Sequence, residues 1–188
     1  MNLSFSTRGW GDLSWDQMLQ EAVDMRFGGV EVYNLFKFPE LTDRGGPFHS
    51  HKVAATIRQL RDLKLKIPCF DTSCDLSTDD AAVDTLTNLI QVAHNTKVGY
   101  VVACALQDDE EAVIAKLKAV LPIAEAADVS VLIKTSGIYA DTGRLRSLLD
   151  LFASDHLAAL WDVHHPYRDF GESGDATIKN LGAYVAHV

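Results

Sequence analysis

The chain has 188 residues, of which 47% are hydrophobic and 23% charged, a composition typical of one globular domain with a substantial core. The formal net charge of -9 and the lack of a basic run argue against a nucleic-acid partner, because affinity for phosphate backbones comes largely from clustered Lys and Arg. No stretch approaches the roughly 18 apolar residues of a membrane span, and the N-terminus lacks a signal core, so we expect a cytoplasmic protein without a membrane partner.

Short apolar or β-branched runs alternate along the chain with segments of helical spacing. The runs predict seven strands, at residues 3–5, 29–33, 67–70, 100–103, 129–135, 157–161 and 184–188. Apolar residues three or four positions apart predict a helix after each of the first six strands. Ser14 and Gln17 form a capping-box pattern before the first helix. The sixth helix, near residues 176–181, is short and weakened by flanking glycines.

The repeat of about 30 residues per strand and helix matches one βα unit with its crossover. Strands without polar alternation suit a parallel sheet covered on both faces, either open and doubly wound or closed as a (β/α)8 barrel. No Gly-rich phosphate loop follows the first strand, which disfavours the doubly wound sheet. The predicted fold is therefore α/β, an incomplete (β/α)8 TIM barrel of about six and a half βα units.

A single domain over residues 1–188 is expected, since no linker or change of composition divides the chain. The last predicted strand leaves the ring about one and a half units short of eight. Two interpretations stay open: the chain is a fragment truncated before strand eight, or it forms a homo-oligomer by pairing its open edges with another copy.

The three cysteines, Cys69, Cys74 and Cys104, lack the C-x-x-C spacing of a zinc ribbon and are odd in number. We therefore expect buried free thiols, because free Cys is among the most buried residue types.

Chemistry in a parallel barrel lies at the C-terminal ends of the strands. The densest cluster there is WDVHHPY at residues 161–167, where Asp162 and His165 leave the sixth strand three residues apart. A D-x-x-H pattern binds a divalent metal or holds a proton-transfer pair. The alternative is that Asp162 caps the loop and the histidines lie at the surface. The position at a strand end favours the functional interpretation.

The sequence resembles the xylose-isomerase-like barrels, the sugar isomerase and epimerase superfamily. The resemblance covers nearly the whole chain through LSFSTRGW, EAVDMRFGGVEVYN, VLIKTSG, WDVHHPYRDFGES and IKNLGAYVAHV. In that family a divalent metal (Mn, Mg or Zn) is held by a Glu ending strand five, an Asp on strand six, a His on strand seven and a Glu on strand eight. The resemblance implies Asp162, His165 and His187 as metal ligands.

Strand five departs from the family pattern, since VLIKTSG places Lys134 where the metal-binding Glu is expected. A protonated lysine has donors only and repels a cation, so it cannot take the place of that ligand. The strand-eight Glu is absent from the chain altogether. We therefore expect the metal to bind weakly or not at all, which puts the activity of this chain in doubt.

Other candidate positions have simpler interpretations beside the functional one. Glu31 faces the barrel mouth by family analogy and is a candidate catalytic carboxylate, or it pairs with Arg8. Trp10 and Tyr167 are candidates for stacking on a sugar ring, or they pack within loops. Arg168 is a candidate ligand of a substrate phosphate, or it pairs with the nearby acids at positions 169 and 172.

Three functions are compatible with these residues. The first is a metal-dependent isomerase or epimerase of carbohydrate metabolism, in which carboxylates move a proton next to the carbonyl of a small sugar, sugar phosphate or polyol derivative. The second is a non-catalytic sugar-binding or assembly domain with a degenerate metal site. The third is Schiff-base chemistry at Lys134, which requires a lowered lysine pKa.

Overall fold

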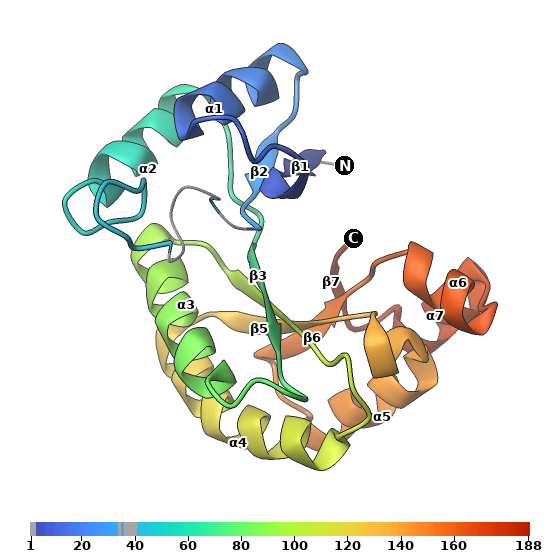
Figure 1. The fold of residues 1–188 in the computed structure, drawn as a ribbon. Coiled ribbons are helices and arrows are strands. Elements are labelled where there is room, and N and C mark those ends of the chain that lie inside the picture. Colours follow the sequence, from blue (N-terminus) through green and yellow to red (C-terminus); the bar gives the residue numbers. More distant parts are fainter. Residues whose placement is uncertain (1–2, 34, 36–40) are drawn as a thin grey trace.

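A computed structural model describes residues 3–33, 35 and 41–188 of the chain (Figure 1). The strands are β1 (Ser4–Ser6), β2 (Gly29–Glu31), β3 (Phe70–Asp75), β4 (Tyr100–Cys104), β5 (Ser130–Lys134), β6 (Leu157–Leu160) and β7 (Val185–His187). The helices are α1 (Trp15–Asp24), α2 (Val53–Asp62), α3 (Ala82–Thr96), α4 (Glu110–Ala127), α5 (Thr142–Phe152), α6 (His164–Phe170) and α7 (Gly174–Leu181), with short 3-10 turns η1 (Thr7–Gly9) and η2 (Gly137–Ala140).

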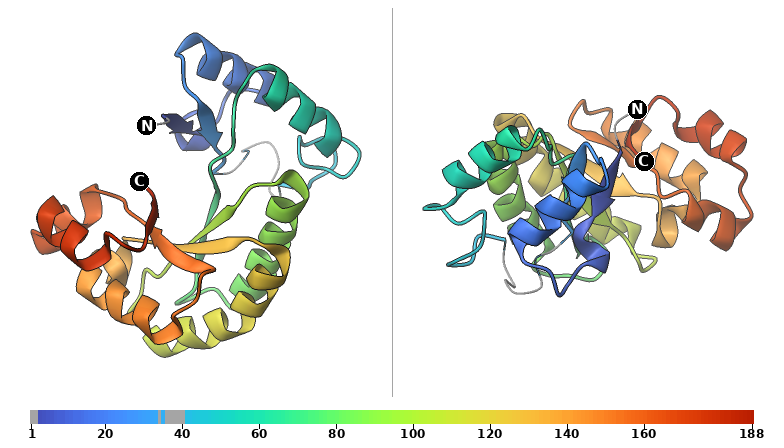
Figure 2. Two further views of the ribbon diagram at one scale, coloured as in Figure 1. Left: turned by 180° about the vertical axis from the view of Figure 1, so that it is seen from behind. Right: turned by 90° about the horizontal axis from the view of Figure 1, so that it is seen from above.

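Every strand pair is parallel, and the strands are paired in sequence order. β1 pairs with β2, and β3 to β7 form one continuous sheet. Two parallel bridges, Gly29 with Lys66 and Val32 with Phe70, connect the first pair to the second sheet. The helices lie outside the ring of strands, and β1 and β7 face each other across an opening (Figures 1 and 2). This arrangement confirms the predicted incomplete (β/α)8 barrel.

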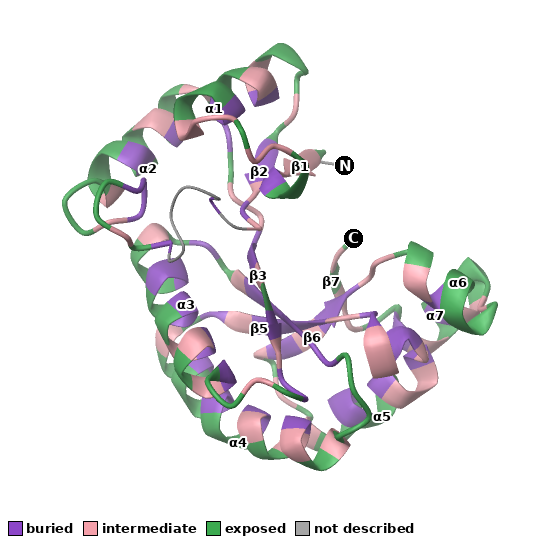
Figure 3. Ribbon diagram, viewed as in Figure 1, coloured by how far each residue is buried: buried purple, intermediate pink, exposed green. Residues whose placement is uncertain are grey.

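The core fills the space between the strands and the surrounding helices. Buried residues are concentrated on the strands and on the strand-facing sides of the helices, while the outer helix faces are exposed (Figure 3). On α4, for example, Val113, Leu117, Val120 and Ala124 are fully buried at spacings of three and four residues. The apolar residues at the predicted helical spacing are therefore the ones that pack the helices against the barrel wall.

Helix caps fix where the helices begin. The predicted capping box of α1 is present, with Ser14 and Gln17 each bonding the other's backbone. At α5, the Asp141 carboxylate accepts hydrogen bonds from the backbone N–H groups of Gly143 and Arg144, at 3.0 and 3.1 Å. Both caps satisfy N–H groups that have no partner within the helix.

Substituting Asp141→Ala is expected to lower the free energy of unfolding by about 1 kcal/mol, the usual cost of losing such a cap. Urea denaturation measures it, with Asp155→Ala, a change at an exposed acid in the loop before β6, as the control. Equal stability of the two variants would show that the Asp141 cap contributes nothing.

The predicted boundaries differ most from the structure at the third strand and after the sixth strand. The third strand was expected at residues 67–70, but β3 begins at Phe70 and includes the acids Asp71 and Asp75. The strand was predicted from a run of apolar residues, and β3 contains two acidic residues that interrupt such a run. The loop expected after the sixth strand instead forms α6, a short helix that ends at Gly171 in the left-handed conformation, with φ of 62°.

The three cysteines are free and buried, as predicted. Among the described residues, no helix combines the length and the apolarity that crossing a membrane requires.

Candidate functional site at the barrel mouth

The inside of the barrel has an apolar floor below a charged mouth. Cys69, Val102, Leu132 and Leu160 form a small cluster of their own, separate from the core under the helices, and each is nearly inaccessible to solvent. Lys134, at the end of β5, comes two residues after Leu132, and Asp162, just beyond the end of β6, comes two residues after Leu160. Ionisable groups thus begin where the apolar floor ends, at the C-terminal ends of the strands.

Lys134 is the centre of the charged mouth. Its Nζ lies 3.6 Å from Asp162 Oδ2 and 3.8 Å from Asp71 Oδ2, so one ammonium group bridges carboxylates from β3 and from the segment after β6. The side chains of Lys134, Asp71 and Asp162 are only 18%, 6% and 26% exposed. Partial shielding from water makes such ion pairs stronger than pairs at the surface.

Backbone contacts hold the two carboxylates in place. The buried Thr135 hydroxyl accepts a hydrogen bond from the backbone N–H of Asp162 at 2.8 Å and donates to its carbonyl oxygen at 3.1 Å. Asp71 Oδ1 accepts from the backbone N–H of Ser73 at 2.8 Å, beside a bulge in β3. Burial raises the pKa of Asp71 above its usual value, and the contacts with Ser73 and Lys134 offset only part of this effect.

His165 extends the cluster toward solvent. Its Nε2 lies 3.7 Å from Asp162 Oδ2, and its Nδ1 lies 3.3 Å from Asp169 Oδ2. The predicted proximity of Lys134, Asp162 and His165 at one end of the barrel is therefore present. The four groups form an unbroken line of contacts from Asp71 through Lys134 and Asp162 to His165.

A second group lies on the β2 and β7 side of the mouth. His187 Nε2 is 3.4 Å from Glu31 Oε2, and Cys69 Sγ is 3.6 Å from the same oxygen. Burial by itself would raise the pKa of Glu31, but hydrogen bonds from His187 and Ser6 outweigh it and leave the pKa below its usual value. Burial and the neighbouring Glu31 raise the pKa of the Cys69 thiol. Glu31 therefore pairs with His187; the expected alternative was Arg8, which stacks on the Tyr33 ring instead.

The expected metal-ligand set does not converge. Asp162 contacts His165, but His187 lies with Glu31 and Cys69. Within residues 3–33, 35 and 41–188, Glu31, Cys69 and His187 are the three metal-ligand side chains whose ligand atoms all lie within 4.8 Å of one another. Asp162 is also neutralised by Lys134. The residues implied by the family resemblance therefore do not fit a divalent metal at Asp162. Lys134 Nζ supplies the positive charge between the carboxylates.

Of the three candidate substrate-binding residues, Arg168 reaches the charged cluster, with its Nη2 3.0 Å from His165 Nδ1. The Trp10 ring packs on Phe5, with 5.1 Å between ring centroids. Tyr167 is 70% exposed on α6. Arg168 donates to Asp169 from Nε at 2.6 Å, the simpler pairing weighed for it. Their roles toward a sugar stay predictions.

Sequence reasoning predicted Cys69 only as a buried free thiol and gave Asp71 no role in the site. Asp71 lies near the start of β3, and Cys69 lies two residues earlier, just before that strand begins. Two-residue alternation into a charged barrel mouth was the signal that could have found them.

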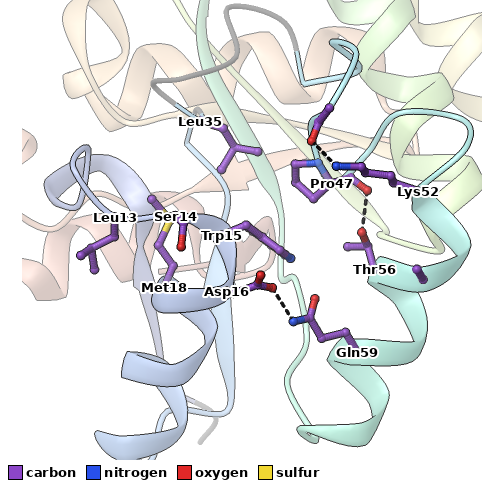
Figure 4. Close-up of a pocket in the computed structure, with 12 residues that line it drawn as sticks. Leu13, Ser14, Trp15, Asp16, Met18, Leu35, Pro47, Lys52, Thr56 and Gln59 are labelled. Carbon is purple, nitrogen blue, oxygen red and sulfur yellow. Dashed lines mark hydrogen bonds between the residues drawn. The ribbon is translucent and has the colours of Figure 1, made fainter.

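A cavity of about 590 Å³ lies elsewhere, between α1 and α2 (Figure 4). Its lining includes Leu13, Trp15 and Met18 on one side and Pro47, Thr56 and Gln59 on the other. Gln59 Nε2 donates to Asp16 Oδ1 across it at 2.7 Å. No residue of the charged mouth lines this cavity, so we place the candidate site at the mouth and not here.

Several solved structures share this fold. A probable 3-DHS dehydratase, AsbF from Bacillus anthracis, aligns with a TM-score of 0.83 at 16% identity, over 100% of this chain and 72% of that chain. An L-ribulose 3-epimerase aligns at 0.75 with 18% identity, over 98% and 68%. The IolI protein with a bound zinc atom aligns at 0.76 with 14% identity, over 98% and 70%. No protein-family model matches the sequence, and no curated protein is significantly similar to it.

Such low identities establish the fold alone. The chain has the fold of the xylose-isomerase-like TIM barrels, as its resemblance implied, and that fold hosts epimerases and a dehydratase among the neighbours. One fold supports many reactions, so the reaction has to be argued from the charged mouth itself.

Proposed function

We propose that the barrel mouth binds a small sugar, sugar phosphate or polyol derivative and catalyses proton transfer next to its carbonyl, the reaction of a sugar isomerase or epimerase. The observation that carries this proposal is the Lys134 ammonium group held between Asp71 and Asp162, 3.8 and 3.6 Å from their carboxylates. In place of a metal, this cation stabilises negative charge that develops on the substrate oxygen.

The roles follow from protonation and position. Asp71 is the proposed base, because a buried carboxylate with a raised pKa is a stronger base than an exposed one. Lys134 donates a hydrogen bond to the carbonyl oxygen, which becomes negatively charged when the adjacent carbon loses its proton. His165, in contact with Asp162, returns a proton at the outer side of the mouth. Return to the former carbonyl carbon, while the neighbouring hydroxyl loses its proton and the carbonyl oxygen gains one, isomerises the sugar. Return to the opposite face of the original carbon epimerises it.

Proton exchange with solvent tests the proposal without knowledge of the final product. We expect the protein in D2O to replace hydrogen by deuterium next to the carbonyl of at least one member of a panel of ketoses and aldoses, free and phosphorylated, followed by proton NMR. Asp71→Asn should slow exchange about 100-fold or more, the usual contribution of a general base. Asp155→Asn, far from the mouth in the loop before β6, is the matched control.

The exchange rate should also fall as the pH drops through the raised pKa of Asp71, because only the ionised carboxylate accepts a proton. Sugar binding measured by calorimetry without any exchange across the panel would contradict the proposal. That outcome would favour a non-catalytic sugar-binding domain.

We also propose that the chain self-associates through its open edges. In the part of the chain that the structure describes, β1 pairs only with β2 and β7 only with β6, and unpaired strand edges bind further strands. Light scattering is expected to give a mass above 20.7 kDa that grows with concentration. A constant monomer mass at every concentration would contradict self-association.

A further inference from the structure

We propose that Glu31, Cys69 and His187 form a zinc site inside the barrel mouth, with at least one coordination position open to a ligand. The three side chains come from separate places in the sequence: the end of β2, the segment before β3 and the end of β7. One ligand atom from each lies within 4.8 Å of the other two.

The distances from Glu31 to the other two ligand atoms match tetrahedral zinc. Zinc lies about 2.3 Å from a thiolate sulfur and about 2.0 Å from an imidazole nitrogen or a carboxylate oxygen, which places tetrahedral ligands about 3.3–3.6 Å apart. His187 Nε2 and Cys69 Sγ lie 3.4 and 3.6 Å from Glu31 Oε2. The ligand atoms of Cys69 and His187 lie within 4.8 Å of each other, so the approach of these two side chains is the movement needed to enclose an ion.

The donor types also favour zinc over the harder divalent ions. A thiolate and an imidazole are ligands that zinc prefers, whereas magnesium and manganese prefer oxygen. Two negative ligands neutralise the ion, and Cys69 loses its thiol proton to solvent when the metal binds. Three protein ligands with a fourth position left open are typical of catalytic zinc sites, in contrast to the four of structural sites.

The surroundings supply both rigidity and access. Cys69 is fully buried in the floor cluster, while the side chains of Glu31 and His187 are 20% and 19% exposed. The Ser6 side chain hydrogen-bonds Glu31 and orients it, as outer contacts commonly do for metal ligands. The open position therefore faces the mouth of the barrel, where a small oxygen-bearing ligand enters.

This site is distinct from the one implied by the family resemblance. That set used Asp162 and His165 with His187, whereas here His187 joins Glu31 and the buried Cys69. Zinc binding at these residues and proton transfer at Lys134 are separate properties, and either can fail without the other.

Cobalt(II) is the probe, because a thiolate bound to cobalt gives a sulfur-to-metal charge-transfer absorption band. We expect chelator-treated protein to bind one equivalent of cobalt with this band, and one equivalent of zinc to abolish it. Cys69→Ser should remove the band, while Cys74→Ser, a change at an equally free and buried cysteine, should retain it. His187→Gln, at a partly exposed position, should weaken cobalt binding about tenfold or more, that is by at least about 1.4 kcal/mol.

Circular dichroism of each variant shows whether it is folded. Absence of the band in the folded wild-type protein would overturn the zinc proposal. So would a band that persists in Cys69→Ser, or unchanged cobalt affinity in folded His187→Gln.

Discussion

Replacing Lys134 by methionine is expected to lower the free energy of unfolding by about 2–3 kcal/mol at neutral pH, because it leaves two shielded carboxylates without their shared cation. Methionine preserves the length of the aliphatic stem, so the loss reports the charge. The Asp71 and Asp162 side chains are 6% and 26% exposed, and water compensates each of them only in part.

The loss should depend on pH in a defined direction. The pKa of Asp71 is raised in the folded state, so its ionisation costs stability as the pH rises through that pKa. Lys134 reduces this cost, and without it the pKa of Asp71 should rise further. The difference between variant and wild type is therefore largest above the raised pKa of Asp71 and shrinks as the pH falls below it, because the carboxyl is then protonated in both folded proteins.

Urea denaturation at several pH values measures this difference. Lys179→Met, a change at an exposed lysine on α7, is the matched control and should have little effect. Adding Asp71→Asn to Lys134→Met should recover part of the stability, since it removes one of the uncompensated charges. A loss that is the same at pH 4 and at pH 7.5 would rule out the charge explanation.

Substituting Lys134→Glu is expected to increase the affinity of the mouth for manganese(II) by about tenfold or more, which corresponds to at least about 1.4 kcal/mol. The change removes a repulsive ammonium 3.6 Å from Asp162 and adds a third carboxylate beside Asp162 and Asp71. Manganese is the suitable ion here because it prefers oxygen ligands and so discriminates against the Cys69 group.

Calorimetric titration of the wild type, Lys134→Glu and the control Lys179→Glu gives the affinities. The control makes the same charge change on the surface and should leave them unchanged. If wild type and Lys134→Glu bound manganese equally well, Lys134 would not occupy a ligand position, and the alignment of strand five with the family pattern would be wrong.

The barrel was predictable because its signals are local and repeated. The period of about 30 residues, the helical spacing on segments such as α4, and the capping box at Ser14 each indicate βα units without any tertiary information. Positions at strand ends then predicted that Lys134, Asp162 and His165 lie together, because parallel strands end at the same side of a barrel.

The partners of Glu31 and His187 were not predictable in the same way. Their pairing joins β2 to β7, and no spacing rule says which side chains meet across the opening between β1 and β7. The sequence predicted Cys69 only as a buried thiol, because buried free cysteines are common. Only the three-dimensional structure shows that its sulfur points at Glu31. Side-chain convergence across a barrel depends on the ring geometry, which the sequence does not encode locally.

The proposed role of the Lys134 ammonium group in place of a metal is tested most directly by deuterium exchange next to the substrate carbonyl, measured on metal-free protein in the presence of excess chelator. We expect the wild-type rate to be unchanged by the chelator and Lys134→Met to lose exchange about 100-fold or more, the magnitude typical of losing stabilisation of a developing oxyanion. Exchange that disappears with the chelator and returns on adding a divalent metal would contradict the role assigned to Lys134.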